Sequence, residues 1–347
     1  MGQPLSVNFS ARRREAARSS RLGRAISLAV ATFLALGASY AASSPAINLR
    51  ESALLRAPFE AIRARVSHHA FGWSGRVNMR TALPNAAVEY PIEIAAGALD
   101  SISWRWVRLG GADSAMLGGT LTQALRAPDQ PGFYRLALET AGGVSRVLVD
   151  GPALAVLVPF EEKQGTTLNG YRIGRYVGER QADGERPSGF LEIGPNDLDL
   201  QVSEHLKVSD FLTHDGSTVW PRYVALEPAL LDKLELVVAA IARSRGGLHD
   251  SHLTIDVHSG FRTPLHNRRI ANSARDSRHQ YGDAADIAID ADGNGRINSR
   301  DVALIVRAIE QVEMMYPELK GGLGVYTLGT SSYVHVDVRG QSVRWTS

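Results

Sequence analysis

The segment from residue 65 to residue 160 alternates apolar and polar positions with the two-residue period of β-strands. Gly, Asp and Pro separate its apolar runs, as turns between strands require. In one run Ile102, Trp104 and Trp106 share a face, which favours a place in a core over a sugar-binding platform. The pattern predicts an all-β, Ig-like sandwich domain over residues 65–160.

The pattern changes beyond this segment. Residues 161–200 are rich in Gly, Glu, Asp and Pro, which predicts a connector. An amphipathic helix with Pro228 near its start follows, and strand patterns return at residues 253–258 and 333–338. We therefore expect an α+β domain with a small antiparallel sheet and flanking helices over residues 201–347.

The first 41 residues have the features of a targeting segment. A basic stretch ends at Arg24 and runs into the apolar sequence ISLAVATFLALGASYAA, where the small residues Ser39 and Ala41 fit the positions before a signal-peptidase cut. This predicts a signal peptide over residues 1–41 and export to the periplasm or cell envelope. The alternative is an uncleaved signal anchor, because the apolar run just reaches the length of a membrane span. A membrane is a partner only in that case.

Composition and charge limit the kinds of active site, metal site and partner that the chain can have. The chain has no Cys, so disulfides, thiolate catalysis and Cys-ligated zinc are excluded, and a metal would need His, Asp or Glu ligands. The whole chain has a net charge of +2. Residues 1–41 contain six arginines and one glutamate and so contribute +5, which leaves about −3 for residues 42–347. A folded region with a net charge of about −3 lacks the basic surface that binding to nucleic acid requires.

Polar residues with metal-binding chemistry lie on otherwise apolar strands. The strand at 253–258 has His258 on its polar face and leads into a Gly- and Pro-containing turn that presents Arg262. His279 and Asp286 follow seven residues apart, and His335 lies on the polar face of the last of these strands. Two histidines and a carboxylate leave one position of a tetrahedral zinc open, as a hydrolase requires.

The motif S-x-H-x-x-G-x-A-x-D at Ser277–Asp286 lies between the SGFRTP turn and the H-x-D strand at His335. In this order and spacing the chain resembles the D-Ala-D-Ala-type zinc metallopeptidases, which group with lysostaphin and the hedgehog domain, and is most similar to their exported murein endopeptidase branch. The resemblance covers about residues 200–347 and not the predicted sandwich. It implies zinc on His279, Asp286 and His335, with Arg262 beside the metal to hold a substrate carboxylate or stabilise an oxyanion.

The sequence lacks the general base that many members of that family carry. Many members carry a Glu three residues before the last zinc ligand or a His two before it, and this chain has Ser332 and Tyr333 there. Asp337 is one substitute, as base or as the orienting partner of His335, because both share a strand face. His258 is the other candidate base.

A second constellation follows in the sequence DADGNGRINSRD at residues 290–301. It fits the spacing of an EF-hand or dockerin-like calcium loop with Gly295 at the sharp turn and runs into an amphipathic helix. The alternative is a polar turn that only caps this helix. The predicted structural Ca²⁺ ligands are Asp290, Asp292, Asn294, Arg296, Asn298 and Asp301.

Together these patterns predict an exported zinc peptidase whose partners are peptidoglycan peptides. By the resemblance it is a D,D-carboxypeptidase or murein endopeptidase that cuts next to a D-amino acid. Two alternatives stay open: a catalytically silent peptidoglycan-binding protein, and a zinc hydrolase of another substrate.

Overall fold

The computed structural model describes residues 64–66, 71–90, 92–94, 102–110, 115–121, 123–140, 145–148, 151–246, 253–327 and 332–346. The predicted leader lies outside them. Among the described residues, no helix has the length and apolar character that a membrane crossing needs. Residues 58–347 form one compact unit. The predicted boundaries at residues 160 and 200 stay predictions.

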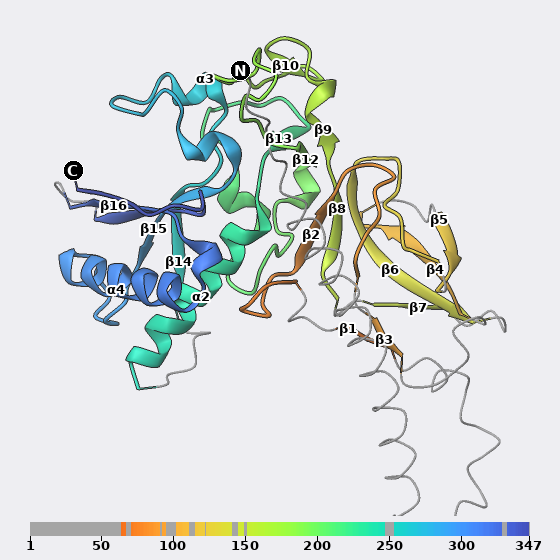
Figure 1. Cartoon of the computed structure of the whole chain (residues 1–347), viewed down its shortest axis with the longest axis horizontal. Helices are drawn as coiled ribbons and strands as arrows, with labels where there is room; N and C mark the ends of the chain where they lie inside the picture. The colour runs from red at the N-terminus through yellow and green to blue at the C-terminus, as the bar shows by residue number, and fades with distance from the viewer. Residues whose placement is uncertain are drawn as a thin grey trace, which may run out of the picture. The chain divides into compact units, whose positions relative to one another are not determined.

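The N-terminal part of this unit is built on a six-stranded sheet (Figure 1). The strand order is β2-β8-β6-β4-β5, with β7 paired to β6 and with β2 and β8 parallel. A separate antiparallel pair joins β1 (Ala64–Val66) and β3 (Ile92–Ile94). The strands of the large sheet are β2 (Met79–Ala82), β4 (Ile102–Arg108), β5 (Ala115–Thr120), β6 (Gly132–Thr140), β7 (Ser145–Val147) and β8 (Ala153–Val156).

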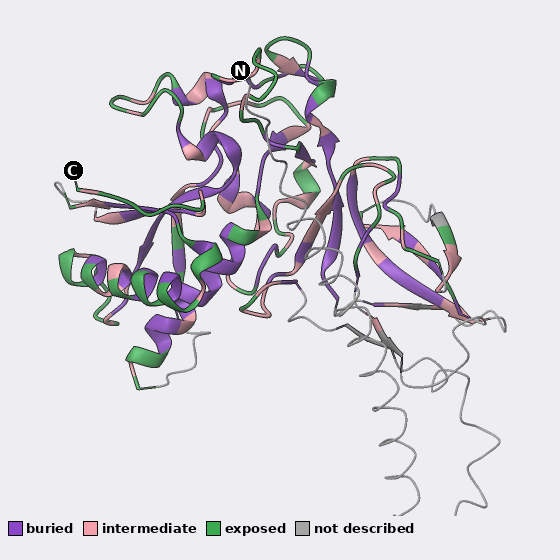
Figure 2. Cartoon of the chain, in the orientation of Figure 1, coloured by how far each residue is buried: buried purple, intermediate pink, exposed green. Residues whose placement is uncertain are grey.

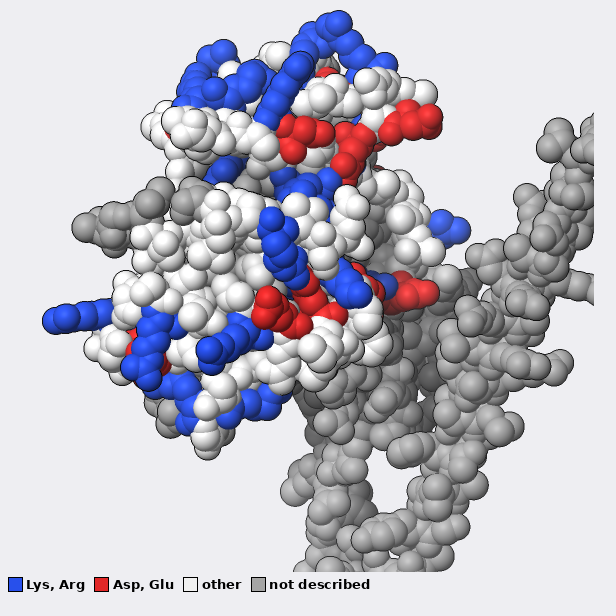
Figure 3. Space-filling model, turned by 60° about the vertical axis from the view of Figure 1, so that its left-hand side comes forward, with Lys and Arg blue, Asp and Glu red and all other residues white. Residues whose placement is uncertain are grey.

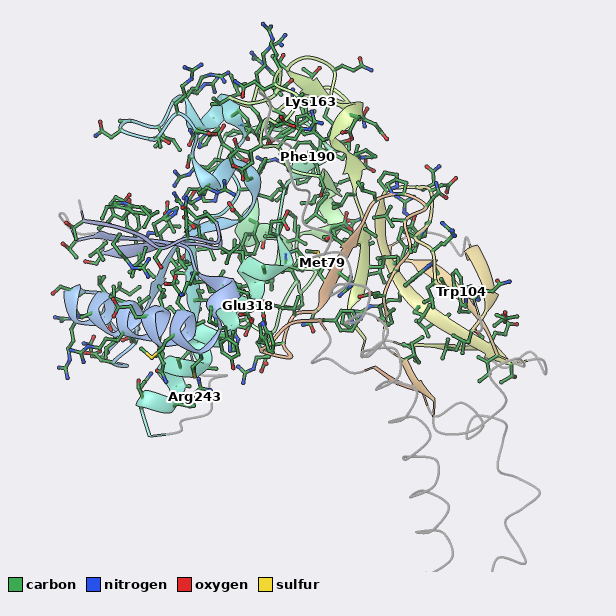
Figure 4. The ribbon with its side chains drawn as sticks, viewed as in Figure 1. Met79, Trp104, Lys163, Phe190, Arg243 and Glu318 are labelled. Atoms are coloured by element: carbon green, nitrogen blue, oxygen red, sulfur yellow. The ribbon has the colours of Figure 1, made fainter. Side chains whose placement is uncertain are left out.

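The two faces of the large sheet contribute to different cores. Trp104 and Trp106 are buried in a local cluster on one face, as the sequence predicts for core tryptophans. On the other face, Met79 and Phe133 belong to a second cluster that also contains Phe190 and the helices of the C-terminal part (Figure 4). The predicted Ig-like sandwich is not shown, and in the described residues the face with Met79 and Phe133 shares its core with the C-terminal part.

The segment predicted as a connector contains regular structure. Its strand β12 (Gly189–Ile193) pairs with β9 (Val158–Pro159) and with β13 (Arg222–Val224). Tyr171 and Tyr176 are buried, so the segment packs into the larger core. The remaining short elements are η4 (Phe160–Glu162), β10 (Thr167–Leu168), β11 (Tyr171–Arg172), η5 (Pro195–Asp197) and η6 (Val208–Phe211).

The C-terminal part is an α+β arrangement with a five-stranded sheet of order β14-β15-β17-β16-β18. Helices α2 (Pro228–Ser244) and α4 (Ser299–Met315) lie along one face of it (Figure 1) and bury its apolar residues (Figure 2). The other face carries Asp286, His335 and Asp337. The strands are β14 (Ile255–Ser259), β15 (Ala284–Ile289), β16 (Gly322–Tyr326), β17 (Tyr333–Asp337) and β18 (Val343–Thr346); the short helices are α3 (Pro264–Asn267), η8 (Arg278–Tyr281) and η9 (Pro317–Leu319).

A buried lysine on α2 fixes the helix to the sheet. Lys233 is fully buried, and its Nζ donates to Glu313 Oε1 at 2.7 Å and to the carbonyl oxygen of Asp337 at 2.8 Å. Burial lowers the pKa of Lys233, while the hydrogen bond with Glu313 opposes that shift. The ammonium group therefore joins α2, α4 and β17 at a place without water.

Replacing Lys233 tests how much this contact stabilises the fold. Lys233→Met keeps the side-chain length but removes one of the positive charges that contact Glu313. The free energy of unfolding, measured by urea titration, should therefore fall by about 3 kcal/mol. Arg243→Ala on the same helix is the control, because Arg243 is exposed and its loss should change stability by less than about 0.5 kcal/mol. Equal stability of the two variants would contradict this account.

Candidate metal centre

The pairing of the five-stranded sheet places a row of residues side by side across it. Ser259 pairs with Asp286, Asp286 with His335, His335 with Gly324, and Gly324 with Trp345. Paired residues on neighbouring strands point to the same face of a sheet. The row therefore lies on the face opposite the helices, and two of the three predicted zinc ligands are neighbours in it.

The third predicted ligand, His279, reaches the row from the short helix η8. Gly282 follows this helix with φ +77°, a left-handed conformation that glycine adopts without strain. A Cβ at position 282 would also overlap the backbone of Ala225. The tight turn returns the chain into β15, so His279 and Asp286 converge although seven residues separate them.

Three side-chain atoms meet at the centre of this site. His279 Nε2 lies 3.2 Å from Asp286 Oδ1 and 3.1 Å from His335 Nδ1, and His335 Nδ1 lies 2.9 Å from Asp286 Oδ1. The exposed fractions of the three residues are only 1%, 6% and 5%. These residues form a buried group that can bind a metal ion.

In each imidazole the inner nitrogen faces the other two converging residues, and the outer nitrogen points away from them. The hydrogen bond made by the outer nitrogen explains why the group fits a cation. His279 Nδ1 lies 2.7 Å from the carbonyl oxygen of Gly260, and His335 Nε2 lies 3.1 Å from Asp337 Oδ2. Both partners only accept hydrogen bonds, so each outer nitrogen carries a proton, and when the rings are neutral the inner nitrogens carry none. The inner nitrogens then present lone pairs toward each other and toward Asp286, an arrangement that a cation such as Zn²⁺ satisfies.

The pKa shifts follow from this crowding. Burial lowers the pKa of His279 more than Asp286 raises it. Burial also acts to lower the pKa of His335, but hydrogen bonds with Asp286 and Asp337 raise it overall. Burial acts to raise the pKa of Asp286, and the two histidines outweigh it and hold that pKa well below its usual range. Asp286 is therefore ionised, as a candidate metal ligand should be.

Arg262 lies beside this group. Its Nε donates to Ser259 Oγ at 2.7 Å, and its Nη2 donates to Asp286 Oδ2, the oxygen that does not face the histidines. The backbone N–H of Arg262 donates to the carbonyl oxygen of His279 at 3.0 Å. The guanidinium thus compensates the charge of Asp286 and places a cation next to the candidate metal position.

Asp337 is enclosed by donors. Its exposed fraction is 0%, and it accepts hydrogen bonds from His335 Nε2, from the backbone N–H of Gly322 at 2.7 Å and from the Arg339 guanidinium. Burial acts to raise its pKa, but the bonds with His335 and Arg339 hold it well below the usual range. Of the two roles predicted for Asp337, this geometry favours the orienting partner of His335 over a base that contacts substrate.

His258 reaches the same face because of a β-bulge. The register between β14 and β15 shifts between Val257 and Ser259, so His258 and Ser259 both face the site. His258 Nε2 lies 3.1 Å from Asp256 Oδ2, and its ring centroid is 5.5 Å from that of Tyr333. About a third of the His258 side chain is exposed. No hydrogen bond joins it to the three converging atoms, and its contact with Tyr333 places it next to the strand that carries His335.

Two aromatic residues at the site were missed by sequence reasoning. Tyr326 stacks on Tyr333 with ring centroids 4.7 Å apart, and Trp345 lies 5.1 Å from the His335 ring. The alternation within β16 places Tyr326 on the same face as Gly324. No motif marks either residue, because their positions depend on strand order. The parallel pairing of β16 with β18 is a long-range feature that local sequence does not show.

The predicted calcium loop precedes α4. Carboxylate oxygens of Asp290, Asp292 and Asp301 lie within 4.8 Å of one another and can hold a cation. The same oxygens accept backbone hydrogen bonds, including Gly295 N to Asp290 Oδ2 at 2.7 Å, and Asn298 caps the helix. Both interpretations, a calcium site and a helix-capping turn, therefore stay open. Asn294 Oδ1 accepts from the Arg296 N–H, within the same loop.

Comparison with known proteins adds one finding to this geometry. Residues 232–337 match the Peptidase M15 family model. The matched segment is less than half of the chain and contains all three converging residues. It supports a D-Ala-D-Ala-type zinc peptidase, a metallopeptidase hydrolase. No curated protein and no solved structure matches the chain.

The bond between Asp337 and His335 yields a prediction about metal affinity. Asp337→Asn keeps the shape but removes the negative charge that fixes the protonated Nε2 of His335, so zinc affinity should fall about 10- to 100-fold. Competition with a chromophoric chelator measures the effect. Asp256→Asn is the matched control, because Asp256 contacts His258 and not a candidate ligand. Unchanged affinity in Asp337→Asn would show that its bond to His335 does not support the metal.

Proposed function

We propose that the chain is an exported zinc peptidase of the periplasm or cell envelope that hydrolyses peptide bonds in peptidoglycan, next to a D-amino acid. The observation that carries the proposal is the convergence of three buried lone pairs beside Arg262, inside the segment that matches Peptidase M15. A D,D-carboxypeptidase and a murein endopeptidase are the two forms of this activity that we propose.

The proposed roles follow from the contacts. His279, Asp286 and His335 would hold zinc, which when bound would supply a Lewis acid to polarise a carbonyl group and lower the pKa of water. Arg262, fixed by Ser259 and Asp286, holds a substrate carboxylate or steadies negative charge on the carbonyl oxygen.

We assign the proton transfer to His258. Its Nε2 is paired with Asp256, which leaves Nδ1 to accept a proton from the attacking water and return it to the leaving amine. The position of His258 beside Tyr333 and its partial exposure support this role. Asp337 instead keeps His335 in the tautomer whose Nδ1 faces the metal.

Substitution of His258 separates proton transfer from metal binding. His258→Ala should lower kcat on a muropeptide at least about 100-fold while zinc affinity stays as in the wild type. His266→Ala is the matched control, since His266 lies on α3 and is not one of the three converging residues. Full activity of His258→Ala would remove His258 from the mechanism and return the assignment of the base to Asp337.

Digestion of purified sacculi tests the function itself. The wild type should release peptide products, lose this activity on chelation and regain it when zinc is returned, whereas His335→Ala should stay inactive. Intact sacculi with zinc-loaded protein would favour a silent peptidoglycan-binding protein, which the residues Ser332 and Tyr333 motivate. Intact sacculi together with cleavage of other amides would favour a hydrolase of a different substrate.

On the one face drawn in Figure 3, acidic side chains interrupt the groups of basic ones, and both lie among uncharged residues. A nucleic-acid site would need a continuous basic surface that follows the phosphate backbone.

We further propose a structural calcium ion in the loop at residues 290–301. The loop begins four residues after Asp286, and the close approach of Asp290, Asp292 and Asp301 supports it. A cation there would fix the chain between β15 and α4 and so help to hold Asp286 in place.

Calcium should therefore stabilise the protein. Thermal unfolding should shift to higher temperature by several degrees when Ca²⁺ replaces EGTA, and Asp292→Ala should abolish the shift. Glu310→Ala on α4 is the control, because it removes an exposed carboxylate outside the loop. An identical melting temperature with and without Ca²⁺ would leave only the helix-capping role.

A further inference from the structure

The last strand of the described chain, β18, brings an indole ring to the candidate metal centre. Trp345 pairs with Gly324 in the row that also contains His335 and Asp286. Gly324 has no side chain, and a Cβ at this position would overlap the Trp345 ring. The ring therefore crosses over β16 and reaches the neighbouring strand, where its centroid is 5.1 Å from that of His335.

Polar contacts fix the orientation of this indole. Trp345 Nε1 donates to Tyr326 Oη at 2.9 Å, and the Tyr326 ring is stacked on Tyr333 at an angle of 10°. The Arg339 guanidinium, which pairs with Asp337, lies 5.9 Å from the centroid of the Trp345 ring. The indole thus lies against the His335 ring and against Arg339, the guanidinium that pairs with Asp337.

The strand that carries Trp345 is anchored by its neighbour in sequence. Arg344 donates to the carbonyl oxygen of Gly321 at 2.7 Å and to Glu313, the partner of the buried Lys233. Val343 and Thr346 are exposed, so apolar burial contributes little to holding β18. The side chains of Arg344 and Trp345 fix this edge strand to the sheet.

We propose that Trp345 is a positioning residue of the metal centre. The indole, whose ring is tilted by 46° to the His335 ring, packs against it and helps to exclude water from the bond between His335 and Asp337. A hydrogen bond to a carboxylate is stronger in such a low-dielectric environment, and it fixes the ring that presents Nδ1 to the metal. The inference rests on the proposed zinc centre, but it concerns a residue beyond the segment that matches the family model.

The test measures metal binding of the full-length protein without a murein substrate. Trp345→Ala should weaken zinc binding about tenfold or more in chelator competition, and Trp345→Phe should restore it to within about threefold, because a phenyl ring still packs against His335. Gly324→Ala keeps the indole but displaces it, so it should weaken binding in the same direction. Val343→Ala is the matched control on the same strand and should bind zinc as the wild type does.

Spectroscopy separates positioning from a general effect on folding. The Co²⁺-loaded Trp345→Ala protein should show visible bands altered from those of the wild type, whereas Val343→Ala should not, because the bands report the arrangement of the ligands. Zinc should change the tryptophan fluorescence of the wild type and not that of Trp345→Phe. Melting of the metal-free variants shows that the comparison uses folded protein.

The outcomes distinguish this inference from the proposed function. Wild-type zinc affinity and wild-type Co²⁺ bands in both Trp345→Ala and Gly324→Ala would overturn the role of Trp345 while the zinc centre stands. A wild-type protein that binds neither Zn²⁺ nor Co²⁺ would overturn both. Weak binding by Trp345→Ala that Trp345→Phe does not restore would also overturn the inference, since ring contact would not be the cause.

Discussion

The account depends on the convergence of three lone pairs in a space almost closed to water. His279 and His335 each use their outer N–H for a fixed acceptor, and this leaves both inner nitrogens facing the carboxylate of Asp286. Buried acceptors without donors are unfavourable. A cation removes that conflict, so the same contacts that orient the rings also define where a metal belongs.

The rest of the C-terminal part holds this convergence in place. The sheet register sets Asp286 beside His335, and the turn at Gly282 brings η8 back over the strand. Beneath the sheet, Lys233 binds the backbone of Asp337 through a contact that also includes Glu313. The positions of the ligands are therefore linked to the stability of the helical layer on the opposite face.

Much of this site could be predicted from local sequence. Alternation placed His335 and Asp337 on one face of a strand, because alternation depends on neighbours in the chain. The grouping of His335 with His279 and Asp286 came from the resemblance to a peptidase family, since 49 residues separate His335 from Asp286. The roles of Asp337 and His258 could not be assigned in this way. Burial of Asp337 depends on Arg339 and Gly322, and the direction of the His258 side chain depends on a bulge that no periodicity reveals.

The helix α2 and the strands β14 and β17 agree with the pattern of apolar positions. The sandwich was not shown, since alternation cannot tell what covers each face of a sheet.

X-ray absorption spectroscopy of the zinc-loaded protein tests the central claim most directly. The account predicts about one tightly bound zinc per chain with two imidazole nitrogens and oxygen ligands at roughly 2.0–2.2 Å, and no sulfur because the chain has no Cys. A zinc surrounded by oxygen alone would place the ion elsewhere, for example among the carboxylates of the loop at 290–301. That result, or the absence of tightly bound zinc, would contradict a centre made by His279, Asp286 and His335.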